Sequence, residues 1–178
     1  MSALYSGYVD QPGLISALES GGVAPFWKGG QLYVSNLSAA QAIVASYNAI
    51  PFAQQQALAQ VGATLDAKVA AGWTYNGSLI AIDSGSRANI AGKALQASLS
   101  LQSGSTVAWP SNMVWLPQGN GPSLALATAQ DMINFGVAVG NYYTNLVLYA
   151  ASLESQINAA TSVSAVQAID LTTGWPTS

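Results

Sequence analysis

Apolar residues recur at helical spacing in two consecutive stretches of the N-terminal half. The segment NLSAAQAIVASYNAI, residues 36–50, has a cap candidate in Ser38 and predicts a helix that ends at Pro51. The next segment, FAQQQALAQVGATLDAKVAAG, predicts a second helix with a glutamine-rich polar face and an end at Gly72. This part of the chain is therefore expected to be helical.

A hairpin and a further helix follow. WTY and SLIAID flank Asn76-Gly77, which is typical of a two-residue type I′ turn because both central positions of that turn need positive φ. The second strand is expected to end at Asp83. Either Ser84 or Ser86 then caps a helix with the sequence SRANIAGKALQASLSLQ.

Three short strand-like segments precede the longest helical pattern. TVAWP, NMVWLP and SLALAT predict a small antiparallel sheet shared with the hairpin. Thr128, with Asp131 in the first turn, caps a helix expected over residues 129–160, roughly 48 Å long at 1.5 Å per residue. In the closing LTTGWP, Gly174 stops the chain and Trp175 is expected to tuck back under the long helix.

Residues 1–35 lack a long periodic element. They combine turn-rich GYVDQPG, a short helical LISALES and a hairpin pattern, PFWKGGQLYVS. We expect an N-terminal arm that laces into a neighbouring subunit, or a hairpin added to its own domain, followed by a helix-rich domain over residues 36–178. Four apolar residues of the arm are candidates for partner contacts: Phe26, Trp27, Leu32 and Tyr33. The predicted fold class is α+β, with several helices including one long C-terminal helix and a small antiparallel sheet of short hairpins.

Charged residues are rare along the whole chain, and this scarcity limits which classes of partner are expected. Charged residues make up 6% of the sequence, against roughly 25% in typical soluble domains. Protein interfaces are depleted in Lys and Glu, so we expect a homo-oligomer or a subunit of a larger assembly. A net charge of −3 with four basic residues argues against nucleic acid or an anionic membrane as a partner.

The absence of His and Cys removes several classes of chemistry. Without His there is no imidazole base near neutral pH, no Ser-His or Cys-His nucleophile pair and no imidazole metal ligand. Without Cys there are no thiol nucleophiles, disulfides or zinc-thiolate sites. We therefore expect no catalytic residues, no metal and no cofactor.

One uncharged segment is long enough to raise the question of a membrane span. Residues 132–153, MINFGVAVGNYYTNLVLYAASL, carry no charge and contain a GxxxG at Gly136 and Gly140. Several side-chain amides interrupt the segment, and each costs a few kcal/mol in hydrocarbon unless it is paired. A core helix that packs closely through its glycines is the better interpretation, and no membrane insertion is expected.

Asp83 and Arg87 stand four residues apart where charges are otherwise rare. As a structural joint, Asp83 sits near the positive end of the helix and pairs with Arg87, a contact worth about 1 kcal/mol. As a catalytic pair, the two residues would need a nucleophile or base beside them, and none stands nearby in the sequence. We interpret them as a joint between hairpin and helix.

An ordered series of segments resembles a domain of unknown function found in bacteriophage tail-associated proteins. The series is GWTYNGSLIAIDSGSRANI, VAWPSNMVWLP, LALATAQDMINF and LESQINAATSVSAVQAIDLTTGWP, which together cover about residues 61–176. Members occur at the C-terminus of tail-fibre and tail-fibre-assembly proteins and have no accepted catalytic residues. The resemblance implies a virion location in the phage tail after synthesis in the host cytoplasm, with other tail proteins as partners.

Three functional classes follow. The first is a structural component of the phage tail, associated with the tail fibre, tail tip or baseplate. The second is a tail-fibre assembly chaperone that binds a fibre and leaves. The third is a carbohydrate-binding module or glycosidase, whose tryptophans would stack on sugar rings. A glycosidase needs two facing carboxylates, and the seven acidic residues show no pairing in the sequence. The first class is preferred.

Overall fold

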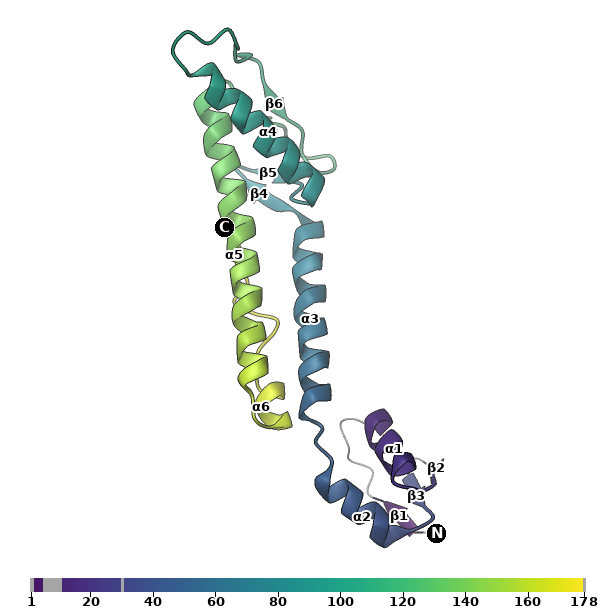
Figure 1. The fold of residues 1–178 in the computed structure, drawn as a ribbon. Coiled ribbons are helices and arrows are strands. Elements are labelled where there is room, and N and C mark those ends of the chain that lie inside the picture. The colour runs from purple at the N-terminus through teal and green to yellow at the C-terminus, as the bar shows by residue number, and fades with distance from the viewer. Residues whose placement is uncertain (1, 5–10, 30, 178) are drawn as a thin grey trace. The chain divides into compact units, whose positions relative to one another are not determined.

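The computed structural model describes residues 2–4, 11–29 and 31–177 and contains both helices and short strands (Figure 1). The helices are α1 (Gln11–Ser20), α2 (Leu37–Ser46), α3 (Ile50–Ala71), α4 (Ser84–Ser100), α5 (Ala129–Ala159) and α6 (Val163–Gln167). The strands are β1 (Ser2–Leu4), β2 (Pro25–Lys28), β3 (Gln31–Val34), β4 (Trp73–Tyr75), β5 (Ser78–Ile80), β6 (Val114–Trp115) and β7 (Leu124–Ala125). The predicted α+β class, with one long C-terminal helix and short antiparallel strands, is confirmed.

The contacts within the chain divide it into two compact units. Unit 1 combines Met1–Ala59 with Ser155–Asp170, and unit 2 combines Gln60–Glu154 with Leu171–Ser178. The boundary expected at residue 35 falls inside unit 1, between β3 and α2.

Unit 1 contains a three-stranded antiparallel sheet with the strand order β1-β3-β2. In the predicted hairpin, Phe26 pairs with Tyr33 and Trp27 with Leu32. A hydrophobic cluster joins this hairpin to α1 and α2, so residues on both sides of residue 35 share one core. Its buried members are Leu14, Leu18, Val23, Leu32, Val34 and Ala40.

Local signals set the ends of the helices in unit 1, although not always at the predicted residue. Asn36, not Ser38, caps α2, since its side chain accepts a hydrogen bond from the backbone N–H of Ala39 at 3.1 Å. Pro51 lies in the first turn of α3, where its missing N–H has no helical partner to lose. Helix α6, which the sequence pattern did not predict, is capped by Ser162.

The first sheet of unit 2 along the chain is the predicted hairpin, formed by β4 and β5. Trp73 pairs with Ile80 and Tyr75 with Ser78. Between them, Asn76 has φ 48° and Gly77 has φ 80°, as a type I′ turn requires. Strand β5 ends at Ile80, three residues before the end expected at Asp83.

The strands after α4 differ from the prediction. Strands β6 and β7 pair with each other in a separate two-stranded sheet and do not join the β4-β5 hairpin. The TVAWP segment is not a strand; its Trp109 instead donates from Nε1 to the carbonyl of Leu126 at 3.0 Å. Two-residue strands, broken by Pro and Gly turns, are too short to build one larger sheet.

Helix α5 begins at the predicted cap. Thr128 Oγ1 accepts from the backbone N–H of Asp131 at 3.1 Å, and the Asp131 carboxylate accepts from the backbone N–H of Thr128 at 2.9 Å. These reciprocal bonds form a capping box. The helix has 31 residues and ends within one residue of the predicted position.

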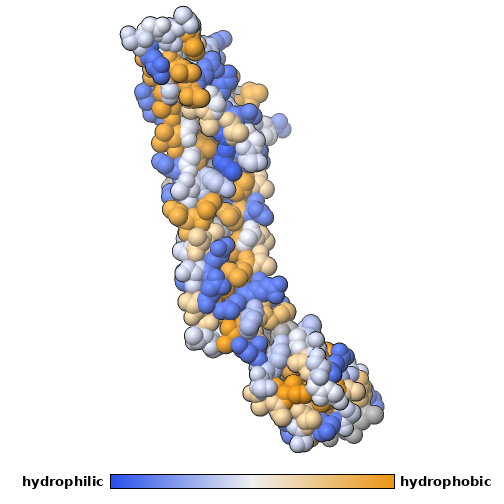
Figure 2. Space-filling model, viewed as in Figure 1, coloured by the Kyte–Doolittle hydropathy of each residue, from blue (hydrophilic) through white to orange (hydrophobic). Residues whose placement is uncertain are grey.

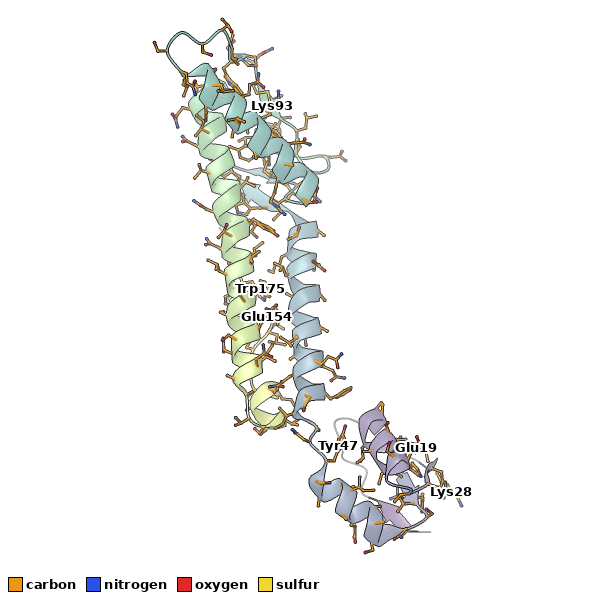
Figure 3. All side chains as sticks on the ribbon, viewed as in Figure 1. Glu19, Lys28, Tyr47, Lys93, Glu154 and Trp175 are labelled. Atoms are coloured by element: carbon orange, nitrogen blue, oxygen red, sulfur yellow. The ribbon has the colours of Figure 1, made fainter. Side chains whose placement is uncertain are left out.

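The segment after Leu171 folds back on α5 within unit 2, as predicted (Figure 3). Trp175 is 5% exposed and meets the ring of Tyr149 edge-on, with centroids 5.2 Å apart. The Tyr149 hydroxyl donates to the carbonyl of Thr173 at 2.7 Å, and Trp175 Nε1 donates to that of Leu171 at 3.0 Å. Gly174 has φ 78°, which allows the chain to turn there.

Candidate functional site

Asp83 is the N-cap of α4, a role that the sequence pattern assigned to Ser84 or Ser86. Its carboxylate accepts hydrogen bonds from the backbone N–H groups of Gly85 at 2.9 Å and Ser86 at 3.0 Å. The Ser86 hydroxyl donates to the other carboxylate oxygen at 2.6 Å. These bonds, led by that of the Ser86 hydroxyl, hold the pKa of Asp83 below its usual value. A carboxylate used in this way stabilises the start of a helix.

Arg87 does not pair with Asp83. Its guanidinium donates to the backbone carbonyl of Ile82 at 2.5 Å and lies over the ring of Tyr143, 3.5 Å from the centroid. Among the described residues no salt bridge joins Asp83 to Arg87. The expected ion pair is replaced by two separate contacts, because the carboxylate is directed to the helix amides and the guanidinium to α5. Asp83 thus caps and stabilises the first turn of α4, and Arg87 attaches that turn to α5 through its contact with Tyr143.

Helix α4 crosses α5 at an angle within unit 2 (Figure 1). Residues of both helices line an open groove of about 460 Å³. The helices approach closely at Gly136, where an added Cβ would lie 2.9 Å from the Cβ of Ala94. One turn further along α5, at Gly140, an added Cβ would meet no described heavy atom within 4 Å. Only one glycine of the GxxxG therefore serves close packing, and the other opens onto the groove. Apolar side chains line most of it: Ile90, Ala91, Ala94, Leu95, Ile133, Val137 and Val139.

A second cavity, of about 260 Å³, lies between the Asn76 turn and the start of α5. It is the more polar of the two, with Asp131 and Asn134 in its lining. The pKa of Asp131 is lowered, first by the hydrogen bond of the Thr128 hydroxyl and then by the Thr128 backbone N–H. Asp131 is therefore an ionised capping group, and its carboxylate is already engaged at the helix end.

A continuous aromatic cluster fills unit 2 and uses two of the tryptophans considered for sugar stacking. Trp73 stacks on Tyr142, and Phe135 lies against both Tyr75 at 5.4 Å and Trp115 at 5.7 Å between ring centroids. Burial raises the pKa of Tyr142. Within the described part of the chain, Trp73 Nε1 is buried without a hydrogen-bond partner. The buried rings of this cluster are core residues and present no open platform.

The aromatic residues expected to contact a partner lie in the β2-β3 hairpin of unit 1. Phe26 and Tyr33 stack with centroids 5.5 Å apart, and Trp27 is 42% exposed. Leu32 instead lies in the core and is 2% exposed. The hairpin therefore offers three aromatic rings at its surface, and Leu32 stabilises it from within.

Among the described residues, no group of three His, Cys, Asp or Glu side chains is placed to hold a metal ion. In the same residues, no helix combines the length and apolar character that a bilayer crossing requires.

Sequence patterns did not reveal the α4-α5 groove or the exposure of Val137 and Leu148. The only available signal was the long uncharged stretch of α5, which also fits a fully buried helix.

Comparison of the chain with curated proteins and with solved structures found no match. A family model described as "Domain of unknown function (DUF4376)" matches residues 52–173. The match spans the β4-β5 hairpin, the capped start of α4, the groove and the beginning of the folded-back C-terminal segment, and it ends before Trp175. The chain belongs to this DUF4376 family.

Proposed function

We propose that this chain is a structural component of a bacteriophage tail, associated with the tail fibre, tail tip or baseplate, and that it acts through protein–protein assembly. It is made in the cytoplasm of the host bacterium and functions in the virion, with other tail proteins as partners. The proposed role requires no catalytic centre, metal or cofactor. The resemblance of residues 61–176 to tail-associated domains supports the phage context.

The observation that carries the assembly role is that many large apolar side chains are exposed on a protein surface that has few charges. Hydrophobic patches are visible over α4 and α5 in Figure 2. Lys, Glu and Asp are depleted from the cores of protein interfaces, whereas aromatic side chains are enriched there. The exposed large hydrophobic residues are Phe26, Trp27, Leu95, Leu99, Leu101, Val107, Val114, Leu116, Val137, Val147 and Leu148.

The β2-β3 hairpin supplies the proposed contact to another tail protein. Phe26 and Trp27 are exposed in β2, and Tyr33 stacks on Phe26 from β3. Rigid aromatic side chains contribute large contact area at low entropic cost, so they often carry much of an interface's binding energy.

Mass spectrometry of purified virions tests the proposal directly. A structural component is expected in the particles at a fixed ratio to known tail proteins after washing in high salt. A protein that is absent from particles but bound to free fibres in the lysate would instead be an assembly chaperone. Absence from both would contradict a tail role.

Two variants test whether the β2-β3 hairpin, and not another exposed apolar site, supplies the contact. Phe26→Ser with Trp27→Ser should reduce recovery of the chain in particles, because both exposed rings are lost. Val114→Ser removes an exposed apolar side chain from β6 and should leave recovery unchanged. Circular dichroism of both variants checks that the fold persists.

A further inference from the structure

One face of α5 is exposed along most of its length in unit 2. Its side chains, which we name the α5 outer face, are Asn134, Val137, Asn141, Thr144, Leu148 and Ala151. Val137 is 57% exposed and Leu148 is 62% exposed. The six positions form two series at seven-residue intervals, 134-141-148 and 137-144-151. Residues seven apart lie along one line of a helix, as the contact positions of a helix pair do, and two of these six carry large apolar side chains, Val137 and Leu148.

No charged residue lies on this face. The chain is uncharged from Met132 to Leu153, and the acidic residues that bracket this stretch, Asp131 and Glu154, lie off the face by the helical period. Like-charge repulsion therefore does not oppose contact between two copies of the same face. Helix α5 of a second copy of the chain would be a partner helix of the same length and repeat.

The order of residues along this face also allows a two-fold pairing. If two copies of α5 run antiparallel about a two-fold axis between Tyr142 and Tyr143, Val137 of one copy faces Leu148 of the other. Asn141 then faces Thr144, and Asn134 faces Ala151. A two-fold interface requires this reciprocity, in which each pair of residues occurs twice.

We propose that the α5 outer face binds the same face of a second copy of this chain, in an antiparallel pair. Val137 and Leu148 form the two apolar contacts, and Asn141 and Thr144 meet at the centre, where their side chains can hydrogen-bond. A polar residue within such a seam favours one register over others.

The groove between α4 and α5 agrees with this arrangement. Val137 and Gly140 both line it, and an added Cβ at Gly140 would meet no described heavy atom within 4 Å. Leu148 of the second copy, which faces Val137, can enter the groove beside it. In the proposed pair, the groove receives the exposed leucine of the second copy.

The first test measures the mass of the full-length chain by light scattering after size exclusion, over a series of concentrations. The native chain is expected to be a dimer. Leu148→Glu should shift the mass to that of the monomer, because it places two carboxylates in the apolar contacts. Leu116→Glu, at an even more exposed leucine outside α5, should leave the dimer intact.

The second test uses cysteines, which the native chain lacks. Positions 137 and 148 are eleven residues apart, about 16 Å along the helix, whereas the Cα atoms of a disulfide are roughly 4.4–6.8 Å apart. In the antiparallel pair, a mixture of Val137→Cys and Leu148→Cys chains should oxidise to a cross-linked dimer. Each variant alone should remain uncross-linked, because its two cysteines lie too far apart.

Several outcomes would overturn the proposal. A native chain that stays monomeric at all concentrations excludes the pair. Efficient cross-linking of each cysteine variant with itself would indicate parallel helices. Dissociation by Leu116→Glu as well as by Leu148→Glu would place the interface elsewhere. The pairing concerns the isolated protein, so its result is independent of whether the chain is found in virions.

Discussion

The indole of Trp73 lies stacked on the phenol ring of Tyr142, with centroids 4.8 Å apart and planes 12° from parallel. Trp73 opens β4 and Tyr142 lies in α5, so the stack anchors the hairpin to the long helix. Both side chains are buried. Offset aromatic pairs of this kind contribute about 0.5–1.5 kcal/mol beyond the burial of their surface.

Trp73→Ala should therefore be among the most damaging substitutions in unit 2. Loss of a buried aromatic side chain with a cavity left behind lowers the free energy of unfolding by about 3–5 kcal/mol. Trp73→Phe should cost much less, because it keeps a ring on Tyr142 and removes an indole N–H that has no partner in the described residues. Urea denaturation of both variants measures the difference, and equal losses would contradict the role of the stack.

The two glycines of α5 should respond in opposite ways to the same substitution. Gly140→Ala adds a methyl group to open space and should raise the free energy of unfolding by about 0.5–1 kcal/mol through helix propensity. Gly136→Ala drives a methyl group against Ala94 and should leave the protein about 1–3 kcal/mol less stable than Gly140→Ala. Thermal and urea unfolding check the order, and a Gly136→Ala variant as stable as Gly140→Ala would show that the helices adjust freely.

Asp83 and Arg87 should contribute to stability independently, because they make separate contacts. Asp83→Ala removes the cap of α4, and Arg87→Ala removes the contacts to Ile82 and Tyr143. Each should lower the melting temperature by a few degrees, on the order found for a lost cap in a domain of this size. In the double variant the two decreases should add, whereas a direct ion pair would make the combined decrease smaller than the sum.

Acid should weaken the protein through the two capping carboxylates. The pKa values of Asp83 and Asp131 are lowered in the folded state, so their stabilisation is fully present above the unfolded-state pKa of about 4 and is lost as pH falls through the folded-state values. Melting temperatures should be nearly constant between about pH 6 and 8, since no His titrates there. They should fall below about pH 4, and Asp83→Asn should make that fall shallower. A transition near pH 7 would be inconsistent with this assignment.

Truncations should separate the hairpin from the core that it shares with α2. Deleting residues 1–35 removes Leu32 and Val34 but leaves their neighbour Ala40, so the apolar side of α2 loses its cover. This variant should bind a hydrophobic dye such as ANS. Deleting residues 1–47 removes the whole cluster and should give less dye binding. Equal dye binding by the two truncations would argue against a shared core.

The parts of the fold that the sequence predicts well are those with a local physical cause. Asn76-Gly77 tolerates positive φ, Gly72 ends α3, and Thr128 with Asp131 forms a capping box without help from distant residues. The errors arise where several local solutions compete. Asp83, Ser84 and Ser86 are all competent caps, and only the folded backbone selects Asp83.

The candidate surfaces depend on packing that a sequence pattern does not contain. The periodicity of α5 predicts a helix, but it does not say which apolar residues a neighbour covers. Leu146 is buried, while Leu148, two residues later, is exposed because it points to the opposite side. In the same way, Gly136 and Gly140 look equivalent in sequence, and only the position of Ala94 distinguishes them.

Two sets of contacts hold the start of α4, the Asp83 cap and the Arg87 contacts, and they respond differently to acid. The Asp83 cap depends on an ionised carboxylate, so protonation in acid releases it. The Arg87 contacts to Ile82 and Tyr143 involve no carboxylate, so protonation of Asp83 leaves both in place. Acidification therefore acts in a fixed order: the first turn of α4 frays while its attachment to α5 persists. Amide exchange in acid would begin at Gly85 and Ser86, with the remainder of the helix still docked.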